Sequence, residues 1–203
     1  ADNYFEYIVL GEVFFILPLY LIDAPFRKLK QAIHDGVWET HRLLGVSTFR
    51  TLNLLVSSGF SKELLRIFLT LLSAYFFFHL QVSLSNLLLT FVFIFLCLPL
   101  FYSLGMICAS LLLWFGRGQG LMGYLNAFLN ISAGVFFPIS VLPQALTTIA
   151  MFSPYTLVLE SSRLFYRSGN YLQLQESIPY LLTLMILCPA SYFCLKRAGE
   201  LRM

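Results

Sequence analysis

The sequence predicts an all-α membrane protein, a helical bundle with five spans and a re-entrant helical hairpin before the last span. Of its 203 residues, 59% are hydrophobic and 11% are charged, less than half the charged share of about 25% in soluble domains. The mean hydropathy is +0.79. A soluble globule of this size could not cover its surface with so few polar groups. The composition therefore argues against a water-soluble enzyme, a disordered chain and a protein that binds nucleic acid.

Apolar stretches of the right length recur along the chain. A helix needs about 20 mostly apolar residues to cross roughly 30 Å of hydrocarbon. The five stretches that approach this length are Tyr4–Ile22, Leu64–Leu80, Leu87–Phe115, Leu121–Phe137 and Ile178–Leu195. We find no internal repeat and no disordered linker, so we expect a single membrane domain over residues 1–203.

A broken apolar segment lies between the fourth and fifth stretches. Residues 138–166 are interrupted by Pro138, Pro143 and Pro154. Each proline removes a backbone donor and clashes with the preceding turn, so two short helices fit this segment better than one span. Irregular backbone survives at membrane depth only where protein or water satisfies it. We therefore expect a re-entrant or interfacial hairpin over residues 138–166.

The basic residues predict the orientation of the spans, because cytoplasmic loops are rich in Lys and Arg. Eleven of the 13 basic residues fall between the first and second stretches or at the start of the second (Arg66), between the third and fourth, or after the fifth. Arg163 and Arg167 lie on the other side. This distribution places the N-terminus outside and the C-terminus in the cytoplasm. An outside N-terminus without a signal peptide leads us to expect six spans in the native protein, the first of them absent here.

Residues 23–62 form the most charged segment, which we expect to be cytoplasmic and to include an amphipathic helix. Helical spacing places Trp38 and Arg42 on one face and Glu39 on a neighbouring face. Such a helix can lie on the membrane surface or dock on a soluble partner, and a merely solvated loop is the alternative. His34 and His41 are seven residues apart, not four as in a helical zinc motif, so we expect no metal site. We also expect no cofactor on this chain.

Ionisable residues inside a membrane are costly and point to function by default. Glu12 lies deep in the first stretch and is a candidate for lining a transport pathway. Glu6 and His79 are closer to the ends of their stretches, where we expect them to reach the outer interface. Glu160 and Arg163 are three residues apart, which favours a local ion pair on one helix face.

One segment of the hairpin region has a specific pattern. Ser132-Ala133-Gly134-Val135-Phe136-Phe137-Pro138 is followed by Leu142-Pro143, and then by Pro154, Thr156 and Arg163. This pattern resembles the membrane subunit of type-2 ABC exporters, in which a Ser-Gly-x-x-Phe-Pro-x-x-x-Leu-Pro sequence precedes a Pro-x-Thr step and an Arg. Ala133 is a small departure, because it stands between the Ser and the Gly.

A second, weaker resemblance to the same family lies in the charged segment. Gly36-Val37-Trp38-Glu39 and Val46-Ser47 align with the Gly-Thr-Leu-Glu and Pro-Val-Ser steps of these exporters, and Gly11 falls where their second span carries a Gly. The resemblance implies six spans and a hairpin before the last. It also implies a coupling helix that rests on a separate ATPase subunit. Its implied residues are Gly36, Trp38, Glu39, Arg42, Val46 and Ser47.

The resemblance further implies an outer gate in the hairpin, formed by Gly134, Phe137, Pro138, Leu142, Pro143, Pro154, Glu160 and Arg163. Two permease copies, identical or different, would line the route, and the ATPase partner would hold ATP and Mg²⁺. Family cargoes include drugs, lipid-linked glycans and polysaccharides, and the expected location is a bacterial or archaeal cytoplasmic membrane. A membrane-embedded enzyme acting on lipid or peptide bonds, using His79 and Glu12, is the main alternative. A non-catalytic assembly factor is a third.

Overall fold

The computed structural model describes residues 2–78, 83–115, 119–132, 134–135, 141, 143–151, 153–168 and 178–201. These described residues are helical almost throughout and include no β-strand. The helices are α1 (Asp2–His34), α2 (Val37–Leu43), α3 (Thr48–Phe78), α4 (Leu84–Phe115), α5 (Gln119–Ser132), α6 (Gln144–Met151), α7 (Pro154–Ser168) and α8 (Ile178–Leu201). The all-α prediction is therefore confirmed.

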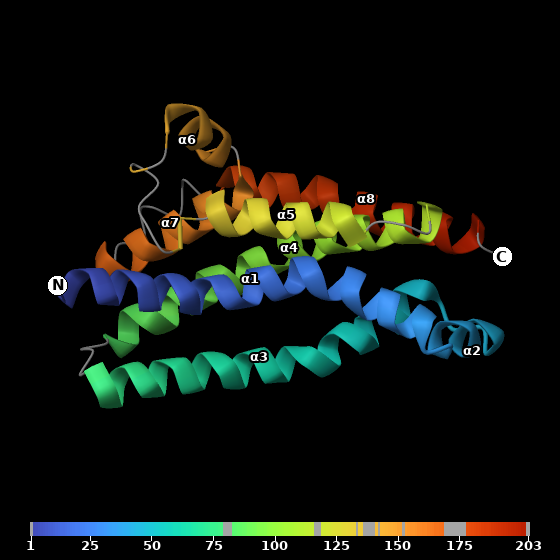
Figure 1. The fold of residues 1–203 in the computed structure, drawn as a ribbon, viewed down its shortest axis with the longest axis horizontal. Coiled ribbons are helices and arrows are strands. Elements are labelled where there is room, and N and C mark those ends of the chain that lie inside the picture. Colours follow the sequence, from blue (N-terminus) through green and yellow to red (C-terminus); the bar gives the residue numbers. More distant parts are fainter. Residues whose placement is uncertain are drawn as a thin grey trace.

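The long helices run side by side along the long axis of the molecule (Figure 1). The N-terminus lies at one end, with α7 and α6 towards it, and we call this the N-terminal end. The short helix α2 lies at the opposite end, together with the end of α8, and we call this the α2 end. The hairpin region and the charged segment thus occupy opposite ends of the bundle, as the distribution of basic residues predicts.

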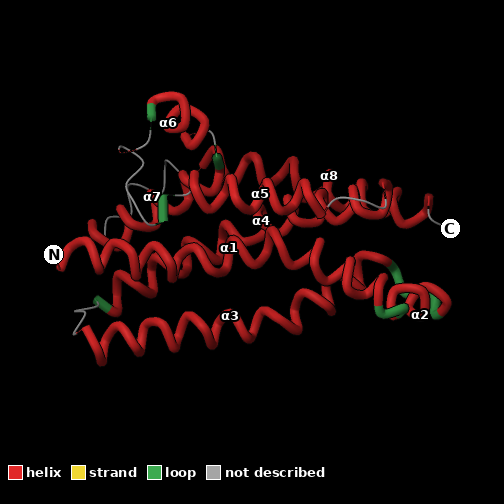
Figure 2. Tube along the Cα trace, viewed as in Figure 1, coloured by secondary structure: helices red, strands yellow, loops and turns green. Residues whose placement is uncertain are grey.

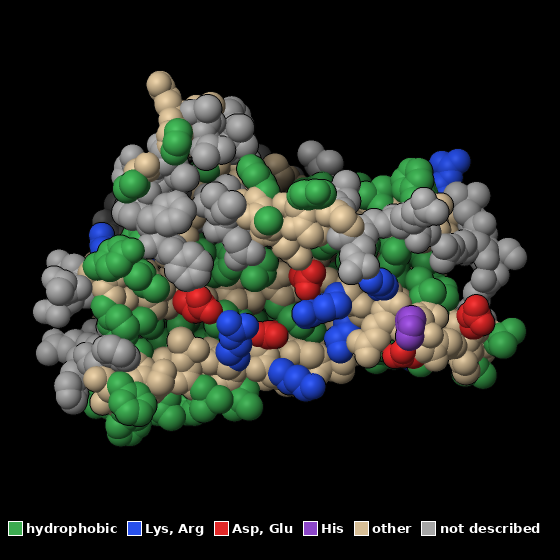
Figure 3. Space-filling view, in the orientation of Figure 1, with side chains coloured by type: hydrophobic (Ala, Val, Ile, Leu, Met, Phe, Trp, Pro, Cys, Tyr) green, Lys and Arg blue, Asp and Glu red, His purple; other side chains and the backbone are tan. Residues whose placement is uncertain are grey.

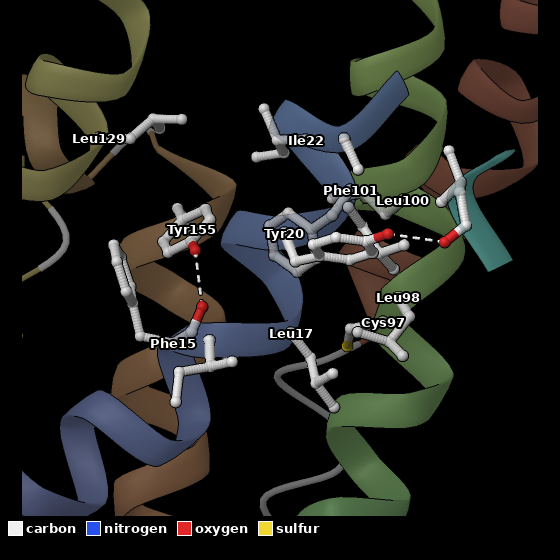
Figure 4. Close-up of a cluster of buried hydrophobic side chains, with 14 of the residues drawn as sticks. Phe15, Leu17, Tyr20, Ile22, Cys97, Leu98, Leu100, Phe101, Leu129 and Tyr155 are labelled. Carbon is white, nitrogen blue, oxygen red and sulfur yellow. Dashed lines mark hydrogen bonds between the residues drawn. The ribbon is translucent and has the colours of Figure 1, made fainter. Parts of the chain in front are cut away.

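Helix α4 is at the centre of the bundle and packs against α1, α7 and α8. Its side chains Phe101, Met106 and Ala109 are at most 1% exposed. In Figure 4, residues of α4 and α1 interleave, and Tyr155 of α7 reaches into the same cluster. Between helices in lipid, close packing and hydrogen bonds replace the hydrophobic effect as the source of association. The dense contacts around α4 are therefore the main source of the bundle's stability.

Two tyrosine hydroxyls bind α1 to its neighbours. Tyr20 donates to the carbonyl of Val56 on α3 at 2.6 Å, and Tyr155 donates to the carbonyl of Phe15 at 3.0 Å (Figure 4). A Cβ at Gly59 would lie 2.2 Å from the Tyr20 hydroxyl oxygen, so only a glycine at that position leaves room for this ring. These bonds fix how far α1 lies from α3 and from α7.

Helix α1 continues through two prolines and needs support at both. Pro18 and Pro25 each lack the amide hydrogen that would bind the carbonyl four residues earlier. Next to Pro18, the Tyr155 hydroxyl binds the α1 backbone at Phe15. At Pro25, Gly105 of α4 lies against the carbonyl oxygens of Leu21 and Ile22. Neighbouring helices thus contact α1 close to both of its prolines.

Three predicted spans, Tyr4–Ile22, Leu87–Phe115 and Ile178–Leu195, lie within α1, α4 and α8. The second predicted span lies in α3 as far as Phe78, and its last two residues fall outside the described residues. The predicted end of the fourth span at Phe137 is wrong, because α5 ends at Ser132, before the left-handed turn at Gly134 (φ 66°). Within the described part of the chain, two helices, over Tyr4–His34 and Leu84–Phe115, are long and apolar enough to cross a membrane. The number of five spans stays a prediction. Helix α1 is longer than the predicted span Tyr4–Ile22 and continues to His34, since the Asp23–Arg27 ion pair and further good helix formers follow.

The hairpin region contains two short helices, α6 and α7, as its prolines predict (Figure 2). Pro154 is the first residue of α7, where a missing amide hydrogen costs nothing. Pro143 precedes α6 and its carbonyl accepts a bond from the amide of Thr147. Phe137, Pro138 and Leu142 lie outside the described residues, so their predicted role in an outer gate stays a prediction.

Candidate functional site

The α2 end is shaped by two glycines with left-handed backbone. Gly36 (φ 72°) ends α1 and opens α2, and Gly45 (φ 71°) follows α2. The amide of Val46 binds the carbonyl of His41 at 3.1 Å, the six-residue bond of a helix that stops at a glycine. Ser47 then caps α3, since its hydroxyl accepts a bond from the amide of Arg50 at 3.4 Å. Gly36, Val46 and Ser47 therefore fix the position of α2.

The surface of α2 combines apolar and acidic side chains. Leu43 is 89% exposed and Leu44 is 74% exposed, and Val37 and Glu39 are exposed beside them. Trp38 is buried, at 8% exposure, in the core cluster. Its side chain is therefore not available to a partner and anchors α2 instead. The side chain of Arg42 lies outside what the structure describes.

A polar cleft lies between α1, α3 and α5. It has a volume of about 320 Å³. Charged side chains gather along the boundary of α1 and α3 in Figure 3. Around the cleft, Arg66 binds Glu12 at 3.1 Å and approaches Glu63 at 3.9 Å. The lining residues are Glu12, Phe15, Ile16, Leu19, Tyr20, Asp23, Arg27, Glu63, Arg66 and Asn126.

The cleft is held together across three helices. Asn126 of α5 donates to a carboxylate oxygen of Asp23 at 3.0 Å, and Asp23 also binds Arg27 at 3.3 Å. The sequence singled out Glu12 but missed Arg66, although an arginine inside an otherwise apolar helix is a signal of the same kind. Asn126 carried no such signal, because a neutral amide in an apolar stretch has many ordinary explanations.

Arg163 of α7 occupies a third, buried site at the N-terminal end. Its Nη1 donates to the Tyr7 hydroxyl at 2.5 Å and to the Gly134 carbonyl at 2.8 Å. Its Nη2 donates to the carbonyls of Val135 at 2.9 Å and of Tyr7 at 3.3 Å. The prediction of an ion pair between Arg163 and Glu160 is wrong. No such pair occurs among the described side chains, and Glu160 is exposed. Three backbone carbonyls and the Tyr7 hydroxyl bind the two terminal nitrogens of Arg163 instead, while its Nε is buried with no hydrogen-bond partner among the described residues.

The comparisons with known proteins give one finding. A family model described as "ABC-2 type transporter" matches residues 7–166, which is most of the chain. The chain belongs to the ABC-2 type transporter family. It is therefore a transmembrane subunit of an ABC transporter, an integral membrane protein of a family whose permeases work with an ABC ATPase and are not themselves enzymes. A search of the curated proteins found no match.

The matched range of this ABC-2 subunit includes all three sites. The α2 turn, the polar cleft and Arg163 lie between residues 7 and 166. The family explains why charged groups are tolerated inside the bundle. In transporters, intramembrane ionisable residues face a protein interior or a water-filled cavity, not lipid.

The ion pair in the cleft of this ABC-2 subunit gives a first prediction. We expect Glu12→Gln and Arg66→Gln to be non-additive, with a coupling energy of about 0.5 kcal/mol, because the two side chains form a partly exposed ion pair in the cleft. The measurement is the unfolding of both single variants and the double variant in mild detergent. Glu12→Gln combined with Arg27→Gln, from the neighbouring Asp23–Arg27 pair, is the control and is expected to be additive. Additive effects for Glu12 and Arg66 would contradict the ion pair.

Proposed function

We propose that this chain is one half of the membrane pathway of an ATP-driven exporter. It works with a separate ATPase subunit, which binds ATP and Mg²⁺, and with a second permease copy. Its location is a bacterial or archaeal cytoplasmic membrane, with the N-terminus outside and the C-terminus in the cytoplasm. Family membership supports the transporter role. The distribution of basic residues supports the orientation, because most of them lie in the segments predicted to be cytoplasmic.

The α2 turn is the observation that carries the coupling part of the proposal. Val37, Leu43 and Leu44 are exposed at the α2 end, beside the exposed Glu39. Exposed apolar side chains rimmed by polar ones are typical of protein interaction sites. Glu39 adds a charge that a basic partner surface can recognise. We infer that α2 docks on the ATPase, held in place by Trp38 and by the turns at Gly36 and Gly45.

The lining of the cleft is suited to an amphiphilic cargo. Its lining joins the apolar side chains of Phe15, Ile16 and Leu19 to the charged groups around Glu12. A ligand with an apolar body and a polar head would find partners for both parts here, as most small-molecule sites pair an apolar lining with a few polar groups. In this proposal Glu12 lies on the transport pathway. The Pro-interrupted hairpin, with Gly134, Pro143, Pro154, Glu160 and Arg163, closes the outer end.

Co-purification tests the proposal directly. The full-length protein is extracted from its native membrane in mild detergent, and the proteins that remain bound are identified by mass spectrometry. We expect an ATPase with a Gly-x-x-x-x-Gly-Lys-Ser/Thr loop, whose backbone amides hold the phosphates. Repeated absence of any ATPase from a folded preparation would contradict the exporter function and favour a membrane enzyme.

Glu39→Arg tests the docking role of α2. Reversing an exposed interface charge places like charges together, and a cost of about 1.4 kcal/mol lowers affinity about tenfold. We expect stimulation of the ATPase by the permease to weaken by about this factor, while the unfolding temperature is unchanged. Arg167→Glu is the control, because it also reverses an exposed charge, on α7, towards the opposite end. Normal stimulation by a folded Glu39→Arg variant would count against the coupling role.

A further inference from the structure

We propose that Arg163 is a positioning residue that fastens α7 and residues 134–135 to α1, so that a movement of α2 and α1 is passed to the N-terminal end of the bundle. The inference rests on the proposed function, because it concerns how a movement started by the ATPase reaches the far end. It assigns to Arg163 a role distinct from the gate contact that its place in the hairpin suggests.

The first observation is the number of segments that one guanidinium joins. Arg163 belongs to α7, Tyr7 belongs to α1, and Gly134 and Val135 follow α5. Four hydrogen bonds of 2.5 to 3.3 Å run from its two terminal nitrogens to these three residues. Tyr7 also donates to the Gly134 carbonyl at 3.1 Å. Segments separated by 28 to 156 residues in the sequence thus meet at one side chain.

The second observation is how closely α1 approaches this side chain. The Arg163 Cζ lies 3.6 Å from the centre of the Tyr7 ring, within the range of a cation–π contact. A Cβ at Gly11 would lie 2.1 Å from the Arg163 Nη2. The guanidinium therefore occupies space on α1 that only a glycine leaves open. Arg163 itself is 8% exposed, so water cannot readily replace the bonds it makes.

The third observation is that three acceptors are backbone carbonyls. These carbonyls move only if the backbone moves. The bonds therefore hold Arg163 to the main chain of α1 and of residues 134–135, and no change of rotamer in those residues can break them. A guanidinium suits this arrangement, because its planar fork can bind several acceptors at once, whereas a lysine ammonium is a single point. Arg163 thus connects the backbones of chain segments that are distant in the sequence.

The fourth observation is that α1 connects this fastening to α2. Helix α1 has 33 residues, which corresponds to a length of about 50 Å. It is braced near Pro18 by Tyr155 and at Pro25 by Gly105. At its other end it leads through Gly36 straight into α2. A rigid-body shift of α1 would therefore act at both ends of the bundle.

The experiment uses the permease–ATPase complex, with the four native cysteines replaced and one reporter cysteine added. The reporter is Glu160→Cys on α7 or Leu43→Cys next to Glu39 on α2, both at exposed positions. The rate of maleimide labelling is measured with and without ATP plus vanadate. In the parent protein we expect both rates to change with nucleotide. With Arg163→Gln, we expect the nucleotide-dependent change in labelling to persist at position 43. At position 160 we expect this change to fall at least about fivefold, which is the lower end of the usual coupling between two sites.

The control variants distinguish a loss of the connection through Arg163 from a loss of the folded structure. Arg167→Gln changes an exposed arginine one turn further along α7 and is expected to keep both responses. Arg163→Lys, which keeps the charge but not the fork, is expected to restore part of the response at 160. If Arg163→Gln does not fold, Tyr7→Phe decides, since it removes one acceptor and keeps the ring. We expect Tyr7→Phe to reduce the nucleotide-dependent change in labelling at position 160 by at least about half, because it removes the hydrogen bond between Arg163 and the Tyr7 hydroxyl.

The outcomes distinguish the two proposals. An undiminished response at 160 in folded Arg163→Gln, or in Tyr7→Phe if the former is unfolded, overturns the fastening. A parent protein that responds at 43 but not at 160 overturns it as well. A parent that responds at neither position overturns the proposed function, and the fastening with it.

Discussion

Gly105→Ala is expected to destabilise the bundle by about 2 kcal/mol, although alanine is the better helix former by about 1 kcal/mol. A Cβ at this position would lie 2.5 Å from the Leu21 carbonyl oxygen and 2.7 Å from that of Ile22. Both atoms are backbone, so no side chain can turn away, and α1 must separate from α4. The measurement is the free energy of unfolding in mild detergent, together with protein abundance in the membrane.

Gly123→Ala is the matched control for this prediction. Gly123 lies within α5, and a Cβ there would have no atom within 4 Å. The substitution is expected to leave stability unchanged or to raise it slightly, because only the helix propensity changes. Equal stability of the Gly105→Ala and Gly123→Ala variants would show that α1 and α4 do not touch in the way described.

Gly11→Ala is expected to cost about 3 kcal/mol, because it displaces the buried Arg163 guanidinium and leaves that charge without its partners. The new Cβ would lie 2.1 Å from Nη2 of Arg163 and 2.9 Å from the Val135 carbonyl oxygen. The loss should be seen both in the unfolding free energy and in the nucleotide response of a reporter on α7.

A double variant identifies the source of this loss. In an Arg163→Gln background the shorter side chain removes the atom that the methyl group would meet first. We therefore expect Gly11→Ala to cost less than half as much there, which is a non-additivity typical of residues in contact. An undiminished cost in that background would attribute the effect to the Val135 carbonyl and not to Arg163.

The helices could be predicted from the sequence because the signals are local. Apolar length located α1, α3, α4, α5 and α8, and three prolines predicted two short helices, α6 and α7, in place of one span. Hydropathy marks only the apolar span Tyr4–Ile22 and does not say where the helix ends. The Asp23–Arg27 pair continues α1 out to His34.

The side-chain environments could not be predicted in the same way. Arg163 has an acid three residues before it, so local spacing favoured an ion pair with Glu160. Its observed partners are Tyr7, Gly134 and Val135. All three are at least 28 residues away in the sequence, so the spacing of residues near Arg163 could not predict them. The family resemblance implies a place for Trp38 on the partner surface, but neither that resemblance nor helical spacing says which face of α2 turns inward.

The tyrosine bonds that connect the helices have a consequence for comparing sequences. Tyr7, Tyr20 and Tyr155 each donate to a main-chain carbonyl, those of Gly134, Val56 and Phe15. Every residue type offers a carbonyl, so these bonds place no demand on the identity of the residue that accepts them. Paired substitutions, which reveal contacts between two side chains, would therefore not reveal these three. An evolutionary contact map of this bundle would under-represent the bonds that set the spacing of α1 from α3 and α7.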